Sequence, residues 1–210
     1  MKNTKVITER GGTPQKALEF IREFPHAIKG YKVIILHVGT NWLSGIPEWK
    51  LYLKMVNLRI SREEYDAQIS ALNPPPAVGK ATKFRETYQK LIDLVKEINK
   101  EATILVSSII PRLWDQERRH LVRKSYNNIL HNFGEQDRVF FIPSYRPFFD
   151  CNRNLKSNLF NRDGLHLSDK GATVLRTYFC DRIDKALRGI IKQPPKTQPS
   201  VTYESGNHLI

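Results

Sequence analysis

Cysteine and long apolar runs are both scarce in this chain, and each absence excludes a class of protein. The only cysteines among the 210 residues are Cys151 and Cys180, which allow at most one bridge and exclude a disulfide scaffold. Neither lies near a second cysteine or a suitably spaced histidine, so we expect no metal site and no cofactor. No apolar run is long enough to span a bilayer. Residues 1–10 lack the apolar core of a secretory signal, which favours an intracellular location, cytoplasmic or nuclear.

Acidic residues are in the minority. The chain has 21 Asp and Glu against 34 Lys and Arg, a net charge of +13. A field of this sign favours anionic partners such as RNA, DNA or acidic lipid. An equally good interpretation is that the excess basic side chains are solvated surface groups. The nearest approach to a dense basic block is Arg118, Arg119, Arg123 and Lys124 on one expected helix. The charge therefore leaves nucleic acid open as a partner without identifying it.

Apolar segments alternate with amphipathic ones, which indicates a single α/β domain over residues 1–192. Runs rich in β-branched residues predict strands at residues 5–8, 33–38, 103–110 and 138–142. Caps and helical periodicity predict helices at residues 14–24, 61–72, 83–99, 116–133 and 169–190. Residues 42–80 are irregular and are interpreted as an insertion, and the polar, proline-rich residues 193–210 as a disordered tail.

Two of the expected helices carry a clear apolar face. In residues 83–99 this face consists of Phe84, Tyr88, Leu91, Ile92, Val95 and Ile98, and in residues 169–190 of Ala172, Leu175, Phe179, Ile183 and Leu187. Both helices are therefore expected to pack against a sheet. Strands that alternate with helices predict a parallel sheet covered on both faces, a three-layer α/β/α fold of the flavodoxin-like kind. In such a fold the ligand site lies beyond the carboxyl ends of the strands.

Three short motifs fall where that rule expects a site. Gly11 and Gly12 follow the first expected strand, Gly39–Thr40–Asn41 follows the second, and Asp163–Gly164–Leu165–His166 precedes the last helix. Taken singly, each motif is compatible with an ordinary turn. Their order in the chain, and the common edge to which the fold would bring them, favour a functional site.

These motifs resemble the blocks of the SGNH (GDSL-type) hydrolase superfamily, and the resemblance extends over roughly residues 5–190. The third block of that family is Gly-x-Asn, read here as Gly39–Thr40–Asn41, and its last block is Asp-x-x-His, read as Asp163 to His166. Gly11 or Gly12 would be the glycine of the second block. The residues of these motifs most resemble those of esterase-like domains carried by some non-LTR retrotransposons and by animal proteins derived from them.

The resemblance implies a role for each residue in ester cleavage. His166 would be the general base for a serine hydroxyl, and Asp163 would fix its tautomer. The Asn41 amide and a backbone N–H at Gly11 or Gly12 would stabilise the oxyanion of the tetrahedral intermediate. Gly39, the glycine of the third block, would belong to the same oxyanion and substrate-binding group. An ester would be the substrate.

The chain departs from the family pattern in its first block. No serine occurs before Ser44, so the Gly-Asp-Ser block and its nucleophile are missing, together with the strand and helix that accompany them. The residues at 5–8 would then be the family's second strand, and a gap is expected beside residues 33–38. Trp42 also replaces the usual Asp after Asn41. Ser44, Ser107 and Ser108 are weak substitutes for the nucleophile.

Three interpretations of this departure remain open. The chain is a truncated or mispredicted gene product, a decayed transposon relic, or a non-catalytic SGNH-like module that binds RNA through a basic surface. The first two together are favoured. The third depends on the net charge and on aromatic residues beside basic ones in the insertion, namely Trp42, Trp49 and Tyr52. Whether the chain is an enzyme, and its oligomeric state, stay undetermined at this stage.

Overall fold

The structure, a computed structural model, describes residues 5–7, 12–43, 54, 55, 57, 59–72, 78–113 and 117–194. Its strands are β1 (Val33–Leu36), β2 (Thr103–Ser107) and β3 (Val139–Ile142). Its α-helices are α1 (Pro14–Glu23), α2 (Thr40–Leu43), α4 (Arg62–Leu72), α5 (Val78–Ile98), α6 (Glu117–Phe133) and α7 (Asp169–Leu187). Three 3₁₀ turns complete the order: η1 (Pro25–Ala27), η2 (Arg146–Phe148) and η3 (Ser157–Leu159).

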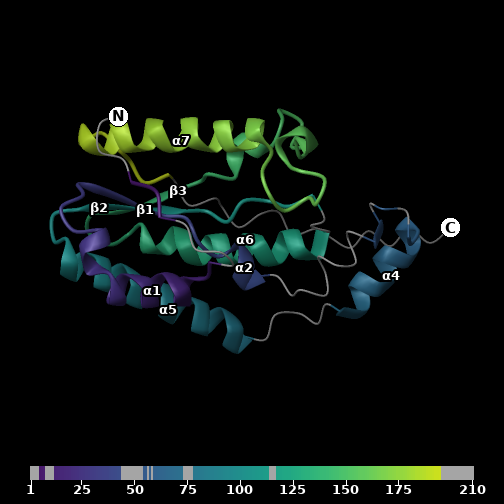
Figure 1. The fold of residues 1–210 in the computed structure, drawn as a ribbon, viewed down its shortest axis with the longest axis horizontal. Coiled ribbons are helices and arrows are strands. Elements are labelled where there is room, and N and C mark those ends of the chain that lie inside the picture. The colour runs from purple at the N-terminus through teal and green to yellow at the C-terminus, as the bar shows by residue number, and fades with distance from the viewer. Residues whose placement is uncertain are drawn as a thin grey trace.

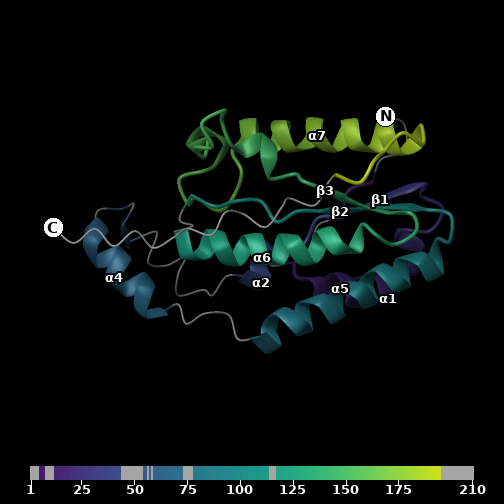
Figure 2. The ribbon, with the colours of Figure 1, turned by 180° about the vertical axis from the view of Figure 1, so that it is seen from behind.

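The three strands form a parallel sheet in the order β1-β2-β3. Leu36 pairs with Val106, and Ser107 pairs with Ile142 at the last rung before Pro143. The helices lie on both faces of this sheet, with α1, α5 and α6 on one side and α7 on the other (Figure 1, Figure 2). The predicted three-layer α/β/α fold with a parallel sheet is therefore confirmed, and a sheet of three strands fits the expected loss of the first strand.

The face covered by α1, α5 and α6 holds the main core. Five side chains of α5 are fully buried there, with no exposed surface: Phe84, Tyr88, Leu91, Ile92 and Val95. Tyr126 of α6 packs edge-on against Phe84, with ring centroids 4.8 Å apart. The predicted apolar face of this helix is thus buried except at Ile98, which is partly buried. The helix begins at Val78, five residues earlier than predicted.

Among the described α-helices, α7 is the one that covers the opposite face, and it is less completely buried (Figure 1). The helix begins as predicted at Ser168, whose hydroxyl accepts the Gly171 N–H at 3.2 Å. Gly171 is its only buried residue. A Cβ at Gly171 would lie 1.9 Å from the Leu159 carbonyl oxygen, so the absent side chain is what lets α7 approach η3. Of the five side chains predicted to face inward, Ala172 and Leu187 are exposed, which corrects that part of the prediction.

The two edges of the sheet also differ. At the β3 edge, the Gln193 side chain accepts the Phe141 N–H at 2.9 Å and donates to the His131 carbonyl at 3.1 Å. His131 Nε2 in turn lies 3.0 Å from the Pro194 carbonyl oxygen. Gln193 and Pro194, which we expected in the disordered tail, thus contact the domain. At the opposite edge, β1 pairs with β2 and with no other strand in the described part of the chain.

Two further predictions concern the N-terminal residues 5–8 and the capping box of the insertion. The predicted strand at residues 5–8 is wrong for residues 5–7, the part of it that the structure describes. These residues do not pair with β1 and form no strand, and Val6 is 79% exposed. Within the insertion, the capping box at α4 is confirmed by bonds between Ser61 and Glu64 in both directions. None of the helices described is long and apolar enough to cross a membrane.

Candidate active site

Asp163 and His166 form a close pair just before α7. The Asp163 Oδ2 atom lies 2.6 Å from His166 Nδ1, and the other carboxylate oxygen accepts the backbone N–H groups of Leu165 and His166, each at 2.9 Å. The His166 side chain is 69% exposed, whereas that of Asp163 is 23% exposed. A carboxylate bound to Nδ1 fixes the tautomer and leaves Nε2 directed toward solvent, which is the arrangement that a general base requires.

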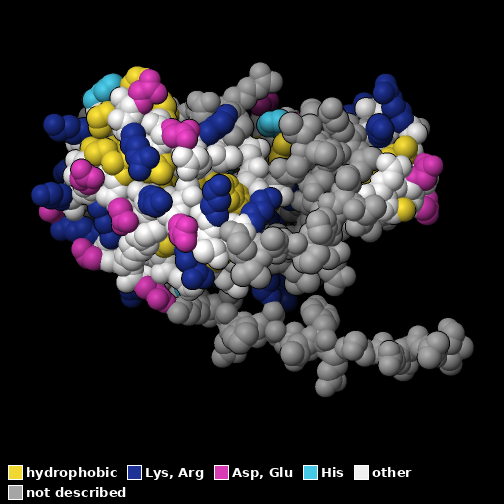
Figure 3. Space-filling view, turned by 90° about the horizontal axis from the view of Figure 1, so that it is seen from below, with side chains coloured by type: hydrophobic (Ala, Val, Ile, Leu, Met, Phe, Trp, Pro, Cys, Tyr) yellow, Lys and Arg dark blue, Asp and Glu magenta, His cyan; other side chains and the backbone are white. Residues whose placement is uncertain are grey.

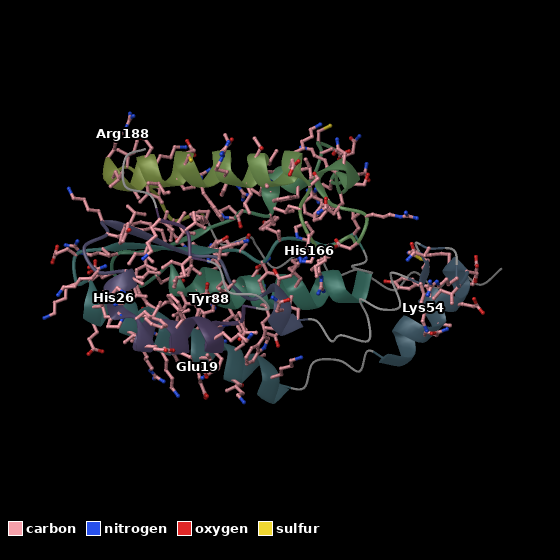
Figure 4. All side chains as sticks on the ribbon, viewed as in Figure 1. Glu19, His26, Lys54, Tyr88, His166 and Arg188 are labelled. Atoms are coloured by element: carbon pink, nitrogen blue, oxygen red, sulfur yellow. The ribbon has the colours of Figure 1, made fainter. Side chains whose placement is uncertain are left out.

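The loop that carries this pair is fixed by backbone hydrogen bonds. Gly164 has a φ of +66°, in the left-handed region that favours glycine. Its carbonyl accepts the Leu113 N–H at 2.9 Å, which ties the loop to the chain that leaves β2. The His166 carbonyl accepts the Asn161 N–H at 2.8 Å. The His166 ring, labelled in Figure 4, is therefore held beyond the carboxyl ends of the strands.

Opposing effects act on the carboxyl group of Asp163. Burial would raise its pKa, but the hydrogen bond from His166 and the two backbone N–H groups hold the pKa of Asp163 below its ordinary value. The group is therefore ionised at neutral pH. A charged partner at Nδ1 stabilises the imidazolium that forms when Nε2 takes a proton.

Asn41 lies at the carboxyl end of β1, in the single turn α2. Its side-chain amide donates to the Gly12 carbonyl oxygen at 3.2 Å, so the second and third motifs meet directly. Gly39 precedes them with a φ of +133°, and a Cβ there would lie 3.0 Å from Ile109. Glycine is therefore required for the chain to leave β1 in this direction. Gly11 lies outside the described residues.

A buried polar cluster occupies the same edge of the sheet. Ser107 Oγ lies 2.8 Å from His37 Nδ1 and 2.6 Å from Ser144 Oγ, and Ser144 Oγ lies 3.0 Å from Ser108 Oγ. The three serines have no exposed surface. Burial lowers the pKa of His37 to about 4, so its ring is neutral. Ser107 and Ser108 are thus enclosed among hydrogen-bond partners and are out of reach of a substrate, while Ser44 lies outside the described residues.

Sequence reasoning missed the histidine and one serine of this cluster. His37 directly follows β1, and Ser144 follows Pro143 at the end of β3. A polar residue at the carboxyl end of a buried strand was the available signal in both positions. Asn127 of α6 was missed too; it bonds the backbone N–H and carbonyl of Ile109, at 2.7 and 3.1 Å. It thereby fixes the chain just after β2.

The arrangement provides a base, its orienting carboxylate and an amide donor. In the part of the chain that the structure describes, the His166 ring has its only hydrogen bond with Asp163, and no serine hydroxyl bonds to it. No group of three or more metal-binding side chains occurs among the described residues either. The site can therefore take up a proton and polarise a carbonyl, but none of its described residues presents a nucleophile to His166.

Comparisons with known proteins bear on the family and on the fold. The model of the GDSL-like Lipase/Acylhydrolase family matches residues 6–174. No curated protein matches the chain. A solved structure described as "a putative platelet activating factor from Streptococcus pneumonia" is similar to 86% of this chain and to 73% of its own chain. The TM-score is 0.56 at 18% sequence identity, a likeness of fold alone.

Proposed function

Since the chain belongs to the GDSL-like lipase/acylhydrolase family, we propose that it is an acyl-ester hydrolase domain without the block that carries the nucleophilic serine. The observation that carries this proposal is the 2.6 Å contact between Asp163 and the Nδ1 atom of an exposed His166. Gly-Asp-Ser is absent from the 210 residues, so the chain by itself is catalytically impaired. A strand ending in Gly-Asp-Ser, encoded upstream in a longer form, would supply the serine.

The proposed reaction gives each of these groups a role. His166 Nε2 accepts the serine proton as the hydroxyl oxygen attacks the ester carbonyl, and it returns that proton to the leaving alcohol. Asp163 stabilises the imidazolium between these steps. The Asn41 amide and the Gly12 backbone N–H donate to the oxyanion. Water then cleaves the acyl-enzyme with the same base. The buried hydroxyls of Ser107, Ser108 and Ser144 take no part.

The experiment compares ester cleavage by the 210-residue chain with cleavage by a form extended upstream to Gly-Asp-Ser, using p-nitrophenyl acetate. The extended form should hydrolyse the ester, and the shorter chain should stay near the uncatalysed rate. In the extended form, His166→Ala should lower kcat by on the order of 10⁴-fold or more, and Asn41→Ala by about 10²–10³-fold. His26→Ala is the matched control, because His26 is also exposed but lies at the other end of the sheet (Figure 4).

Cleavage that persists undiminished after His166→Ala would refute the mechanism. Equal activity of the two forms would refute the need for an upstream serine, since the shorter chain would then hold another nucleophile. Loss of activity on His26→Ala would show that the assay reports folding and not the site.

A second candidate function is binding of nucleic acid. Its sequence argument partly fails, because Trp42 packs against Phe84, with ring centroids 5.7 Å apart, and is not free to stack on a base. Trp49 and Tyr52 lie outside the described residues. The net charge of +13 still supports this function, because a field of this sign attracts an anionic partner.

A further inference from the structure

The single turn α2 carries Asn41, and its position depends on other elements. A helix of four residues is not stable by itself. The Asn41 side chain is exposed, and among the described residues its amide donates to the Gly12 carbonyl oxygen at 3.2 Å. Because the amide nitrogen carries two hydrogens, a second N–H is left for an oxyanion. The direction of that N–H therefore follows the backbone of α2.

Trp42, the residue after Asn41, anchors the turn in the main core. Its backbone N–H donates to the Gly39 carbonyl oxygen at 3.0 Å. Its ring packs against Phe84 of α5, with ring centroids 5.7 Å apart. The indole nitrogen Nε1 is buried. Trp42 thus carries a polar N–H into the core, where such a group requires an acceptor.

Tyr126 of α6 presents its hydroxyl to that indole. The residue is 1% exposed, and its ring meets Phe84 edge-on, with centroids 4.8 Å apart. Burial raises the pKa of Tyr126, and hydrogen bonding with Trp42 opposes the rise, which places the indole N–H beside the phenol oxygen. The two atoms are imperfectly aligned, and neither has another hydrogen-bond partner among the described residues. Each polar atom therefore depends on the other.

The hydroxyl of Tyr126 is not needed to fill the core. A phenylalanine would keep the ring contact with Phe84 without burying a polar group. A buried hydroxyl costs free energy unless a partner compensates for it, and Trp42 is the partner that lies beside it. The polar atom of Tyr126 therefore serves the α2 turn more directly than it serves the core.

Asn127, the next residue of α6, fixes the chain on the other side of the turn. Its side chain bonds both the N–H and the carbonyl of Ile109, at 2.7 and 3.1 Å. Ile109 in turn closes on Gly39, where a Cβ would lie 3.0 Å from the Ile109 side chain and 3.6 Å from that of Phe84. The backbone is therefore held before Asn41 as well as after it.

The outer surface of this side of the molecule offers no other role for the Tyr126 hydroxyl. Figure 3 shows this side, where Lys and Arg side chains are interspersed with Asp and Glu over the described surface. Tyr126 is only 1% exposed. A ligand bound to this surface would therefore not reach the hydroxyl.

We infer that Tyr126 is a positioning residue for the oxyanion donor, because its hydroxyl holds the Trp42 indole and thereby the backbone of Asn41. This inference rests on the proposed function, in which the Asn41 amide donates to the oxyanion. Tyr126 does not touch the ester. It acts through Trp42, which stands where the family motif has Asp.

The first experiment uses NMR on the 210-residue chain. Loss of a signal in Trp42→Phe identifies the Trp42 indole N–H among the three tryptophans, and loss of a signal in Asn41→Ala identifies the Asn41 amide. Tyr126→Phe should speed exchange of that indole N–H with solvent and shift the Asn41 amide resonances. The matched control is Tyr178→Phe on α7, which removes another buried hydroxyl without a partner in the described part of the chain. It should change neither signal.

The second experiment measures p-nitrophenyl acetate cleavage by the form extended upstream to Gly-Asp-Ser. Tyr126→Phe should lower kcat about tenfold and leave KM within about twofold, because a displaced donor weakens a contact made in the transition state. Together with Trp42→Phe it should cost no more than Trp42→Phe alone, since Tyr126 acts through Trp42. In an Asn41→Ala background it should cause no further loss. Tyr178→Phe should leave kcat unchanged.

Unchanged indole exchange and Asn41 resonances in Tyr126→Phe would overturn the inference, whatever the activity of the extended form. A tenfold loss that persists in the Asn41→Ala background would also overturn it, because Tyr126 would then support the fold in general. If the extended form cleaves no ester, the proposed function fails, and the NMR experiment alone decides whether Tyr126 holds the α2 turn. Circular dichroism melts confirm that each variant is folded.

Discussion

The helices α5 and α7 have similar apolar patterns, but they pack very differently. Five side chains of α5 have no exposed surface, whereas α7 buries Gly171 alone. The difference comes from their neighbours. α5 lies beside α1 and α6 on a crowded face, and α7 covers its face without another helix (Figure 1). An apolar face predicts that a helix packs, but the number of neighbouring elements decides how deeply it is buried.

The largest effect should come from matched leucine truncations in the two helices. Leu91→Ala in α5 should lower the free energy of unfolding by about 2–5 kcal/mol, because it leaves a cavity in a fully buried site. Leu175→Ala in α7 should cost less than about 1.5 kcal/mol, since that side chain is only part-buried. Urea unfolding followed by circular dichroism gives both values. Equal costs would mean that the two faces are equally well packed.

The close approach of α7 to η3 gives the next largest effect. Gly171→Ala should destabilise the domain by about 1–3 kcal/mol, because its Cβ would meet the Leu159 carbonyl oxygen at 1.9 Å. Thr173→Ala, on the exposed side of the same helix, is the control and should change stability by less than about 0.5 kcal/mol. If Gly171→Ala left the stability unchanged, α7 would be able to shift on its face of the sheet. The packing of α7 would then differ even more from the tight packing of α5.

Acid should weaken the α7 face before it affects the active-site pair. The pKa of His37, which contacts Phe179 of α7, is about 4 in the folded chain and 6.5 unfolded. The unfolded chain therefore binds a proton first, so this contribution is intact above pH 6.5 and falls between pH 6.5 and 4. His37→Gln should flatten the fall in stability over that window, and exposed His26→Gln should not. Asp163, with a lowered pKa, loses its contribution only in more acidic solution.

The smallest effect should come from the far end of α7. Leu187 is 56% exposed, so Leu187→Gln should change the free energy of unfolding by less than about 0.5 kcal/mol. A thermal or urea melt suffices to measure it. A cost as large as that of Leu91→Ala would contradict the exposure of this face and point to a partner that covers Leu187 in solution.

Much of the fold could be predicted, because the strands and helices are encoded by local patterns. The ends of strands were less predictable, because the length of a neighbouring strand decides where the pairing stops. β2 stops at Ser107, three residues before the apolar run ends, because its partner β3 stops at Ile142 and the ladder has no further rung. Residues 5–7 have the composition of a strand, yet form none without a partner.

The site was predictable where its residues bond within short motifs. Asp163 and His166 are three residues apart, and their contact follows from that spacing. Asn41 and Gly12 are 29 residues apart, and the parallel order of elements brought them together as expected. The His37, Ser107 and Ser144 cluster was missed because it depends on three strand ends meeting at one point. Each residue taken singly carries the signal of a polar side chain after a buried strand, but that signal does not say which of these side chains bond to one another.

The amide of Gln193 has a consequence for self-association. A sheet whose two edge strands can both pair with further strands can grow without limit, as in fibrils. Here the Gln193 amide takes the place of a neighbouring main chain at Phe141. A strand added beside β3 would therefore first have to displace Gln193 from that backbone N–H, which makes this edge a poor template for growth.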